Sequence, residues 1–195
     1  MSSNGGLTFA SLRLIGVGIG ALALAVSGVF GGLDSVEHGP PVLAAGATYE
    51  GQPWSVTVIG AEMRANLDDL ELDFMQPDEP GNRWLVVTAT IEVTAPESRN
   101  DLSDILRLSK VDDLVRPEPR SVVLARDLTL LGYLNPDMPE RVLFVWEQRS
   151  SAPGPAELEI LVYGKTYRVS TLSNSRQWLD LQLRARVRVP VGSAP

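Results

Sequence analysis

Three arginines, Arg184, Arg186 and Arg188, alternate with apolar residues near the end of the chain. On an extended strand they would project from one face at intervals of about 6.8 Å, twice the rise per residue. Such a stripe can bind anionic headgroups, an envelope polyanion or the acidic face of a partner protein. The alternative is that these arginines face solvent and pair with acidic residues on neighbouring strands.

Acidic residues crowd the segment 68–79, which includes Asp68, Asp69, Glu71 and Asp73. A pair of carboxylates suffices for glycoside hydrolysis, and several oxygen ligands suffice for calcium. The loop pattern D-x-[DN]-x-[DN]-G is missing, and nothing in the sequence places these carboxylates in a cleft. A solvated acidic loop is the alternative, so the role of this segment stays open.

Other chemistries lack their residues. The chain has no cysteine, which excludes disulfides, thiolate metal sites, a cysteine nucleophile and a lipoprotein anchor. The single histidine, His38, lies in a proline-containing linker, where it cannot complete a Ser-His-Asp triad or a histidine zinc site. Phosphate-loop and dinucleotide-binding patterns are also missing. The sequence therefore predicts no catalytic residue, no cofactor and no metal.

The distribution of charge bears on partners. The formal net charge is −7. Residues 49–172 hold 21 acidic and 12 basic side chains, a net of −9, whereas residues 173–195 hold 4 basic and 1 acidic, a net of +3. An acidic body argues against a nucleic-acid partner, because binding phosphates requires clustered lysine and arginine.

The segment 14–33 is uncharged and apolar, with Ser27 as its only polar side chain. About 20 residues at 1.5 Å each span the hydrocarbon core of a bilayer. Arg13 precedes the segment, which predicts a single-pass plasma-membrane anchor with a cytoplasmic N-terminus and an extracytoplasmic C-terminal domain. A signal peptide cleaved near residues 25–27, leaving a secreted protein, is the alternative. Close helix packing is a further hypothesis, and it rests on two small-residue motifs, Gly16-x-x-x-Gly20 and Gly28-x-x-x-Gly32.

The pattern then changes to period 2. Strands are predicted near 54–61, 83–94, 141–148, 158–163, 166–171 and 179–189, with Gly164-Lys165 as a hairpin turn. A short strand at 70–74 and a hairpin between 105–109 and 114–116 are further predictions, and 121–131 fits either a strand or a helix. Short strands separated by Pro and Gly predict a mainly β chain, an immunoglobulin-like antiparallel β-sandwich preceded by one N-terminal transmembrane helix. A closed antiparallel barrel is the alternative.

The predicted domain organisation has five parts. These are a cytoplasmic stub at 1–13, the transmembrane helix or signal anchor at 14–33, a linker at 34–47, the sandwich at 48–172, and a C-terminal strand and tail at 173–195. Pro40-Pro41 stiffens the linker towards an extended form.

Three stretches carry a resemblance to a known family. They are Tyr49-Glu50-Gly51, Trp84-Leu85-Val86-Val87-Thr88-Ala89-Thr90-Ile91, and the run from Leu134 to Trp146, LNPDMPERVLFVW. Across residues 48–172 the chain resembles the immunoglobulin-like extracellular domains of unknown function on bacterial, especially actinobacterial, envelope proteins and secreted antigens. The resemblance implies a fold and a location but no catalytic residues. Many relatives are lipoproteins, and this chain departs from them in lacking the anchoring cysteine.

These observations together favour a non-enzymatic envelope protein whose extracytoplasmic sandwich is a binding or scaffold module. Its partners would be membrane lipid through residues 14–33 and an envelope protein or polyanion. Two alternatives stay open. One is a carboxylate-dependent enzyme acting on cell wall or sugar, and the other is an accessory subunit of a membrane complex.

Overall fold

The computed structural model describes residues 39–70, 72 and 75–193. The predicted anchor at 14–33, with Gly16, Gly20, Gly28 and Gly32, lies outside the described residues. Within the described part of the chain, no helix has the length and apolar character needed to cross a bilayer.

The described residues form nine strands and two short 3-10 helices, so the chain is mainly β, as predicted. The strands are β1 Val42–Ala44, β2 Thr48–Tyr49, β3 Trp54–Arg64, β4 Arg83–Val93, β5 Leu106–Ser109, β6 Ser121–Leu124, β7 Glu140–Gln148, β8 Glu157–Val169 and β9 Arg176–Ser193. The two 3-10 helices are η1 Asp68–Leu70 and η2 Leu102–Asp104.

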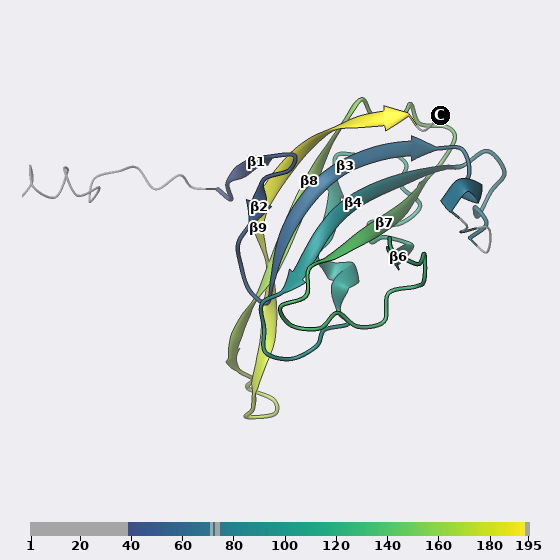
Figure 1. The fold of residues 1–195 in the computed structure, drawn as a ribbon. Helices are drawn as coiled ribbons and strands as arrows, with labels where there is room; N and C mark the ends of the chain where they lie inside the picture. The colour runs from purple at the N-terminus through teal and green to yellow at the C-terminus, as the bar shows by residue number, and fades with distance from the viewer. Residues whose placement is uncertain (1–38, 71, 73–74, 194–195) are drawn as a thin grey trace, which may run out of the picture. The chain divides into compact units, whose positions relative to one another are not determined.

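The strands pair in the order β5-β8-β9-β3-β4-β7-β6, with β1 added to β9 and β2 added to β3 (Figure 1). One layer of the sandwich contains β1, β5, β8 and β9, and the other contains β2, β3, β4, β6 and β7. The two layers are joined where the end of β9 runs beside β3. The long β8–β9 hairpin reaches past the ends of β3 and β4 (Figure 1).

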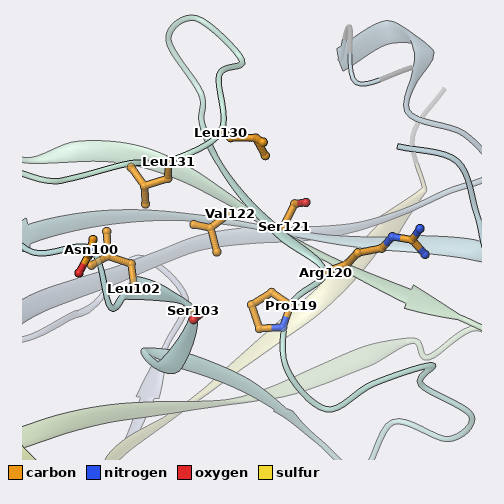
Figure 2. A pocket seen from close by; sticks show the side chains of 9 residues that line it. All are labelled: Asn100, Leu102, Ser103, Pro119, Arg120, Ser121, Val122, Leu130 and Leu131. Atoms are coloured by element: carbon orange, nitrogen blue, oxygen red, sulfur yellow. The ribbon is translucent and has the colours of Figure 1, made fainter. Parts of the chain in front are cut away.

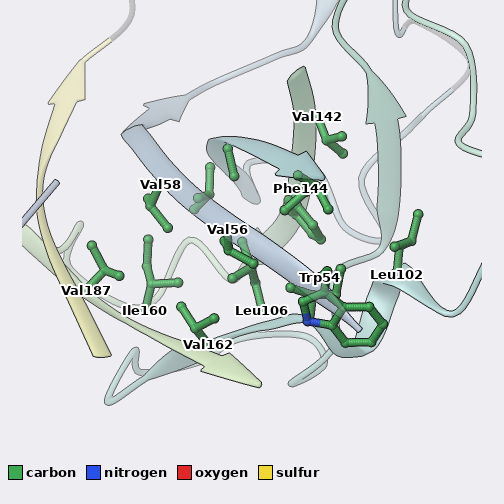
Figure 3. Packing of buried hydrophobic residues seen from close by; sticks show 14 of the residues in the cluster. Trp54, Val56, Val58, Leu102, Leu106, Val142, Phe144, Ile160, Val162 and Val187 are labelled. Atoms are coloured by element: carbon green, nitrogen blue, oxygen red, sulfur yellow. The ribbon is translucent and has the colours of Figure 1, made fainter. Parts of the chain in front are cut away.

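The main core lies between the two layers (Figure 3). Alternate residues of β3 and β4 point into it, as do alternate residues of β7, β8 and β9, which is the pairing of faces that period 2 predicts. Fully buried aromatic rings anchor this core, namely Trp54, Phe144 and Trp146. The last two stack with their centroids 6.1 Å apart.

A second core covers the opposite face of β4, β6 and β7. Trp84, Val86 and Val145 pack there beneath Leu67 and other apolar residues of the segment before β4. The acidic connection therefore supplies an apolar cover as well as charge. Residues 71, 73 and 74 of the strand predicted at 70–74 lie outside the described residues, and Asp68–Leu70 is a 3-10 helix.

Three predictions about pairing are wrong. The sheet is not purely antiparallel, because β9 runs parallel to both β1 and β3. The segment 105–109 does not pair with 114–116. Its strand β5 pairs instead with β8 of the same layer, which places Ile105 and Leu106 in the main core facing the other layer. Leu114 forms an isolated bridge to Gln148.

The predicted turn at Gly164-Lys165 is also wrong. Strand β8 continues to Val169, and the hairpin turns where Ser170 and Asn174 close the backbone hydrogen bonds. Gly164 instead lets the backbone of β8 pass close to the Gln52 carbonyl, because a Cβ at position 164 would lie 3.0 Å from that oxygen.

The predicted borders at residues 47/48 and 172/173 do not separate the sandwich from its flanking segments, because both flanking segments contain strands of the sheet. Strand β1 lies inside the predicted linker at 34–47 and pairs with β9. The segment 173–195 begins in the β8–β9 turn, and β9 pairs with β8, β3 and β1.

Candidate functional site: an aromatic pocket beside the β8–β9 hairpin

The three arginines predicted as a binding stripe lie on β9 but differ in their surroundings. Arg184 is partly buried and donates to the Thr166 hydroxyl at 3.2 Å. Arg186 pairs with Glu159 across the sheet at 3.5 Å, whereas Arg188 is exposed and has no ion-pair partner among the described residues. One of the three is thus neutralised by a cross-strand pair, and they do not form a uniform cationic face.

The predicted acidic candidates do not assemble into a described site. Asp68 is exposed on η1, whereas Glu71 and Asp73 lie outside the described residues. Within the described ranges, no group of three or more histidine, cysteine, aspartate and glutamate residues is placed to hold a metal ion.

A pocket of about 470 Å³ lies beside the outer part of the β8–β9 hairpin. We call it the aromatic pocket, and its lining residues are Glu97, Arg99, Tyr167, Arg176, Gln177 and Trp178. Four of these six are charged or carry an amide, so the pocket combines two aromatic rings with a polar rim.

The two rings are positioned by strand register. Tyr167 on β8 lies directly opposite Trp178 on β9, and their centroids are 5.0 Å apart with planes inclined at 43°. Cross-strand aromatic pairs of this kind stabilise a hairpin. The indole Nε1 of Trp178 donates to Glu97 Oε1 at 2.5 Å, which ties the hairpin to the loop after β4. Tyr167 is 50% exposed, so much of its surface is open to a ligand.

The base of the pocket is an ion cluster between two indoles. The guanidinium carbon of Arg99 lies 5.8 Å from the ring centre of Trp54 and 6.0 Å from that of Trp178. Asp101 accepts from Arg99 Nε at 2.8 Å and from Lys165 Nζ at 2.5 Å. Burial by itself would raise the pKa of Asp101, but the hydrogen bonds from these two cations outweigh it and lower the pKa to about 2.

Arg176 differs from Arg99 in having no partner. It is exposed, and no carboxylate among the described residues pairs with it. Its neighbour Gln177 donates its amide to the hydroxyls of Ser173 and Ser175, at 2.9 Å each, which orders the rim of the pocket. The pocket therefore presents one free guanidinium beside an aromatic surface.

The cluster around Asp101 gives a prediction for acid stability. Because folding lowers the pKa of this carboxyl from 3.8 to about 2, its contribution is complete above about pH 4 and is lost as the pH falls towards 2. Asp101→Asn is expected to lower the free energy of unfolding by at most about 2 kcal/mol at pH 7. Urea unfolding of wild type and variant at pH 7, 4 and 2.5 should show the difference shrinking in acid. The exposed control Asp112→Asn should change little, and a pH-independent difference for Asp101→Asn would contradict the assignment.

A second hollow, the η2–β6 groove, has a volume of about 370 Å³ (Figure 2). Its wall is mixed, with the apolar Leu102, Val122 and Leu131 beside polar Asn100, Ser103 and Ser121, and the guanidinium of Arg120 points away from them (Figure 2). That guanidinium pairs instead with Asp78 and Glu147. The groove therefore offers hydroxyl and amide groups but, among the described residues that line it, no charged side chain aimed into it.

Comparisons with known proteins give the chain no family and no activity. No family model matches the sequence, and no curated protein matches it. Among solved structures, an uncharacterised β-sandwich protein from Clostridium difficile 630 is similar, with 10% sequence identity and a TM-score of 0.45. The similarity covers 80% of this chain and 97% of that one.

The residues of the aromatic pocket do not stand out in the sequence. Their assembly depends on the register that places Tyr167 opposite Trp178, and a turn at Gly164-Lys165 would not produce it. One local feature of the sequence points to them. Tyr167 and Trp178 end a mainly polar stretch, YRVSTLSNSRQW, in which large aromatic side chains are expected to be exposed.

Proposed function

We propose that this chain is a non-enzymatic binding module of the bacterial envelope, anchored through residues 14–33, with an immunoglobulin-like sandwich outside the membrane. The aromatic pocket supports the binding role. It joins the half-exposed ring of Tyr167 to the unpaired guanidinium of Arg176 on the β8–β9 hairpin. Sites that recognise a ligand typically combine an aromatic surface with a few placed polar groups.

The chemistry of the pocket favours recognition over turnover. Its carboxylate, Glu97, is engaged by the indole of Trp178 and lies near the guanidinium of Arg99, at 3.5 Å. Both contacts are made by the same oxygen, Oε1, and they hold the carboxylate in place as a hydrogen-bond acceptor. The charged groups at the pocket base are likewise committed to one another, which leaves Arg176 for the ligand.

Retention on cell wall tests this function. The full-length chain, in mild detergent that removes any contribution from lipid, is mixed with detergent-extracted bacterial cell wall and sedimented. We expect wild type to be retained and the Tyr167→Ala/Arg176→Ala variant to bind at least tenfold more weakly. The lost contacts include a charge-assisted hydrogen bond, and about 1.4 kcal/mol corresponds to that factor.

Arg188→Ala is the matched control. It removes an exposed arginine from the same strand, 12 positions and roughly 40 Å from Arg176, and it also tests the arginine stripe. Retention that depends on Arg188 and not on Arg176 would move the binding surface to the stripe. Wild type that stays in the supernatant would remove the binding function, and release of wall sugar during the incubation would favour the enzyme.

A further inference from the structure

We propose that the aromatic pocket takes a carbohydrate that carries a carboxylate, namely a uronic-acid residue within an otherwise neutral glycan. This inference rests on the proposed binding function and names the ligand class of the same pocket. It follows from three features: the ring pair, the unpaired arginine and the charge of the surrounding body.

The ring pair suits a sugar. A pyranose ring has apolar C–H faces and a polar rim of hydroxyls, so it can stack on an aromatic ring while its edge makes hydrogen bonds. The pocket has that pattern, with Tyr167 and Trp178 on one side and charged or amide groups around them. A wholly apolar ligand would leave these polar groups without water or partners, which is costly.

The arginine specifies the acid. The guanidinium of Arg176 can bind a carboxylate through two parallel hydrogen bonds, and no described residue competes for it. Arg99 cannot take this role, because Asp101 already holds it through Nε at 2.8 Å and through Nη2 at 2.5 Å. Glu97 accepts from Trp178 through Oε1, and its second oxygen can accept a sugar hydroxyl.

The body charge limits how acidic the ligand can be. Residues 49–172 carry 21 acidic and 12 basic side chains, so a densely charged polyanion would be repelled by most of the domain. One carboxylate beside neutral sugars meets Arg176 without bringing further negative charge near that body. The inference is therefore a sparsely charged glycan.

A pair of matched disaccharides tests the ligand class. Glucuronyl-glucose and glucosyl-glucose of the same linkage differ at one position: the first sugar carries a carboxylate in the former and a hydroxymethyl group in the latter. Their dissociation constants are measured by calorimetry and tryptophan fluorescence with the full-length chain, in a detergent without a sugar headgroup. We expect the acidic disaccharide to bind at least tenfold more tightly, and the advantage to shrink as salt is added.

Three variants separate the contributions. Arg176→Ala should abolish the preference, because it weakens binding of the acidic disaccharide at least tenfold more than binding of the neutral one. Tyr167→Ala should weaken both ligands, and Arg188→Ala should change neither. Unchanged urea midpoints for all three would show that folding is intact.

The outcomes distinguish this inference from the proposed function. Equal affinity for the two disaccharides, or displacement of the acidic one by N-acetylglutamate at similar concentration, would overturn the acidic saccharide. Cell-wall retention that needs Tyr167 and Arg176 without binding of either disaccharide would overturn the ligand class and leave the binding function standing. If wild type neither is retained on cell wall nor binds either disaccharide, both the proposed function and the ligand class are overturned.

Discussion

Glu147→Ala is expected to lower the free energy of unfolding by about 3–5 kcal/mol, because it removes a buried carboxylate on which three donors converge. The Glu147 residue is 1% exposed. Its Oε1 accepts from the Asp78 backbone amide at 2.6 Å and from Asn82 Nδ2 at 2.8 Å, and Oε2 pairs with Arg120. The variant leaves the Asp78 backbone amide and the Asn82 side-chain amide without this acceptor. It also leaves Arg120, whose guanidinium carbon lies 5.5 Å from the ring centre of Trp84, with Asp78 as its carboxylate partner.

The same strand offers a matched control for that prediction. Glu140 on β7 also pairs with an arginine, Arg126, but the arginine side chain is 60% exposed. Such a surface pair contributes at most about 1 kcal/mol, so Glu140→Ala should shift the urea midpoint only slightly. Equal losses for the two variants would show that the Glu147 network is no stronger than a surface ion pair.

The Glu147 network shows why period-2 patterns give strands but not their surroundings. In the stretch RVLFVWEQ the glutamate resembles the polar end of a strand that leaves the core. It is buried because Asn82 and Arg120, both distant in the chain, converge on it. No local pattern encodes that convergence.

Strand existence was predictable where alternation is long. The segments 83–94 and 179–189 alternate over enough residues to exclude a helix, and β4 and β9 occupy them. Strand partners were not predictable in the same way. The short segment 105–109 has no residue that selects β8 over a nearby hairpin partner, and only the burial of Ile105 and Leu106 between the layers decides it.

In the candidate site, too, the features set by a local pattern were predictable and those set by strand pairing were not. The arginines on β9 were visible because regular spacing makes them conspicuous, yet Arg186 is paired with Glu159. The aromatic pocket has members from the loop after β4 and from both strands of the hairpin. Its members are brought together by the Tyr167–Trp178 register, and a shift of one residue would turn one ring to the opposite face.

The second large effect is expected for Trp54→Ala, which should lower the free energy of unfolding by about 3–5 kcal/mol. The Trp54 side chain is fully buried in the main core (Figure 3). Its Nε1 donates to the Tyr163 carbonyl at 2.7 Å, a bond that joins the two layers. Removing the indole creates a cavity and leaves that carbonyl without its donor. Trp54→Phe keeps most of the ring and should lose only about 1–2 kcal/mol.

Trp54 also connects the stability of the core to the aromatic pocket. Arg99 and Lys165 both lie 5.8 Å from the ring centre of Trp54, and the same Arg99 reaches Trp178 on the pocket side. Loss of the indole should therefore release the ion cluster and weaken ligand binding in conditions where the variant is still folded. Urea unfolding and disaccharide affinity measured on both Trp54 variants test this, with Tyr133→Ala, at a 65% exposed residue, as the control. A Trp54→Ala protein with lowered stability but wild-type affinity would show that the pocket holds its shape without the indole beneath it.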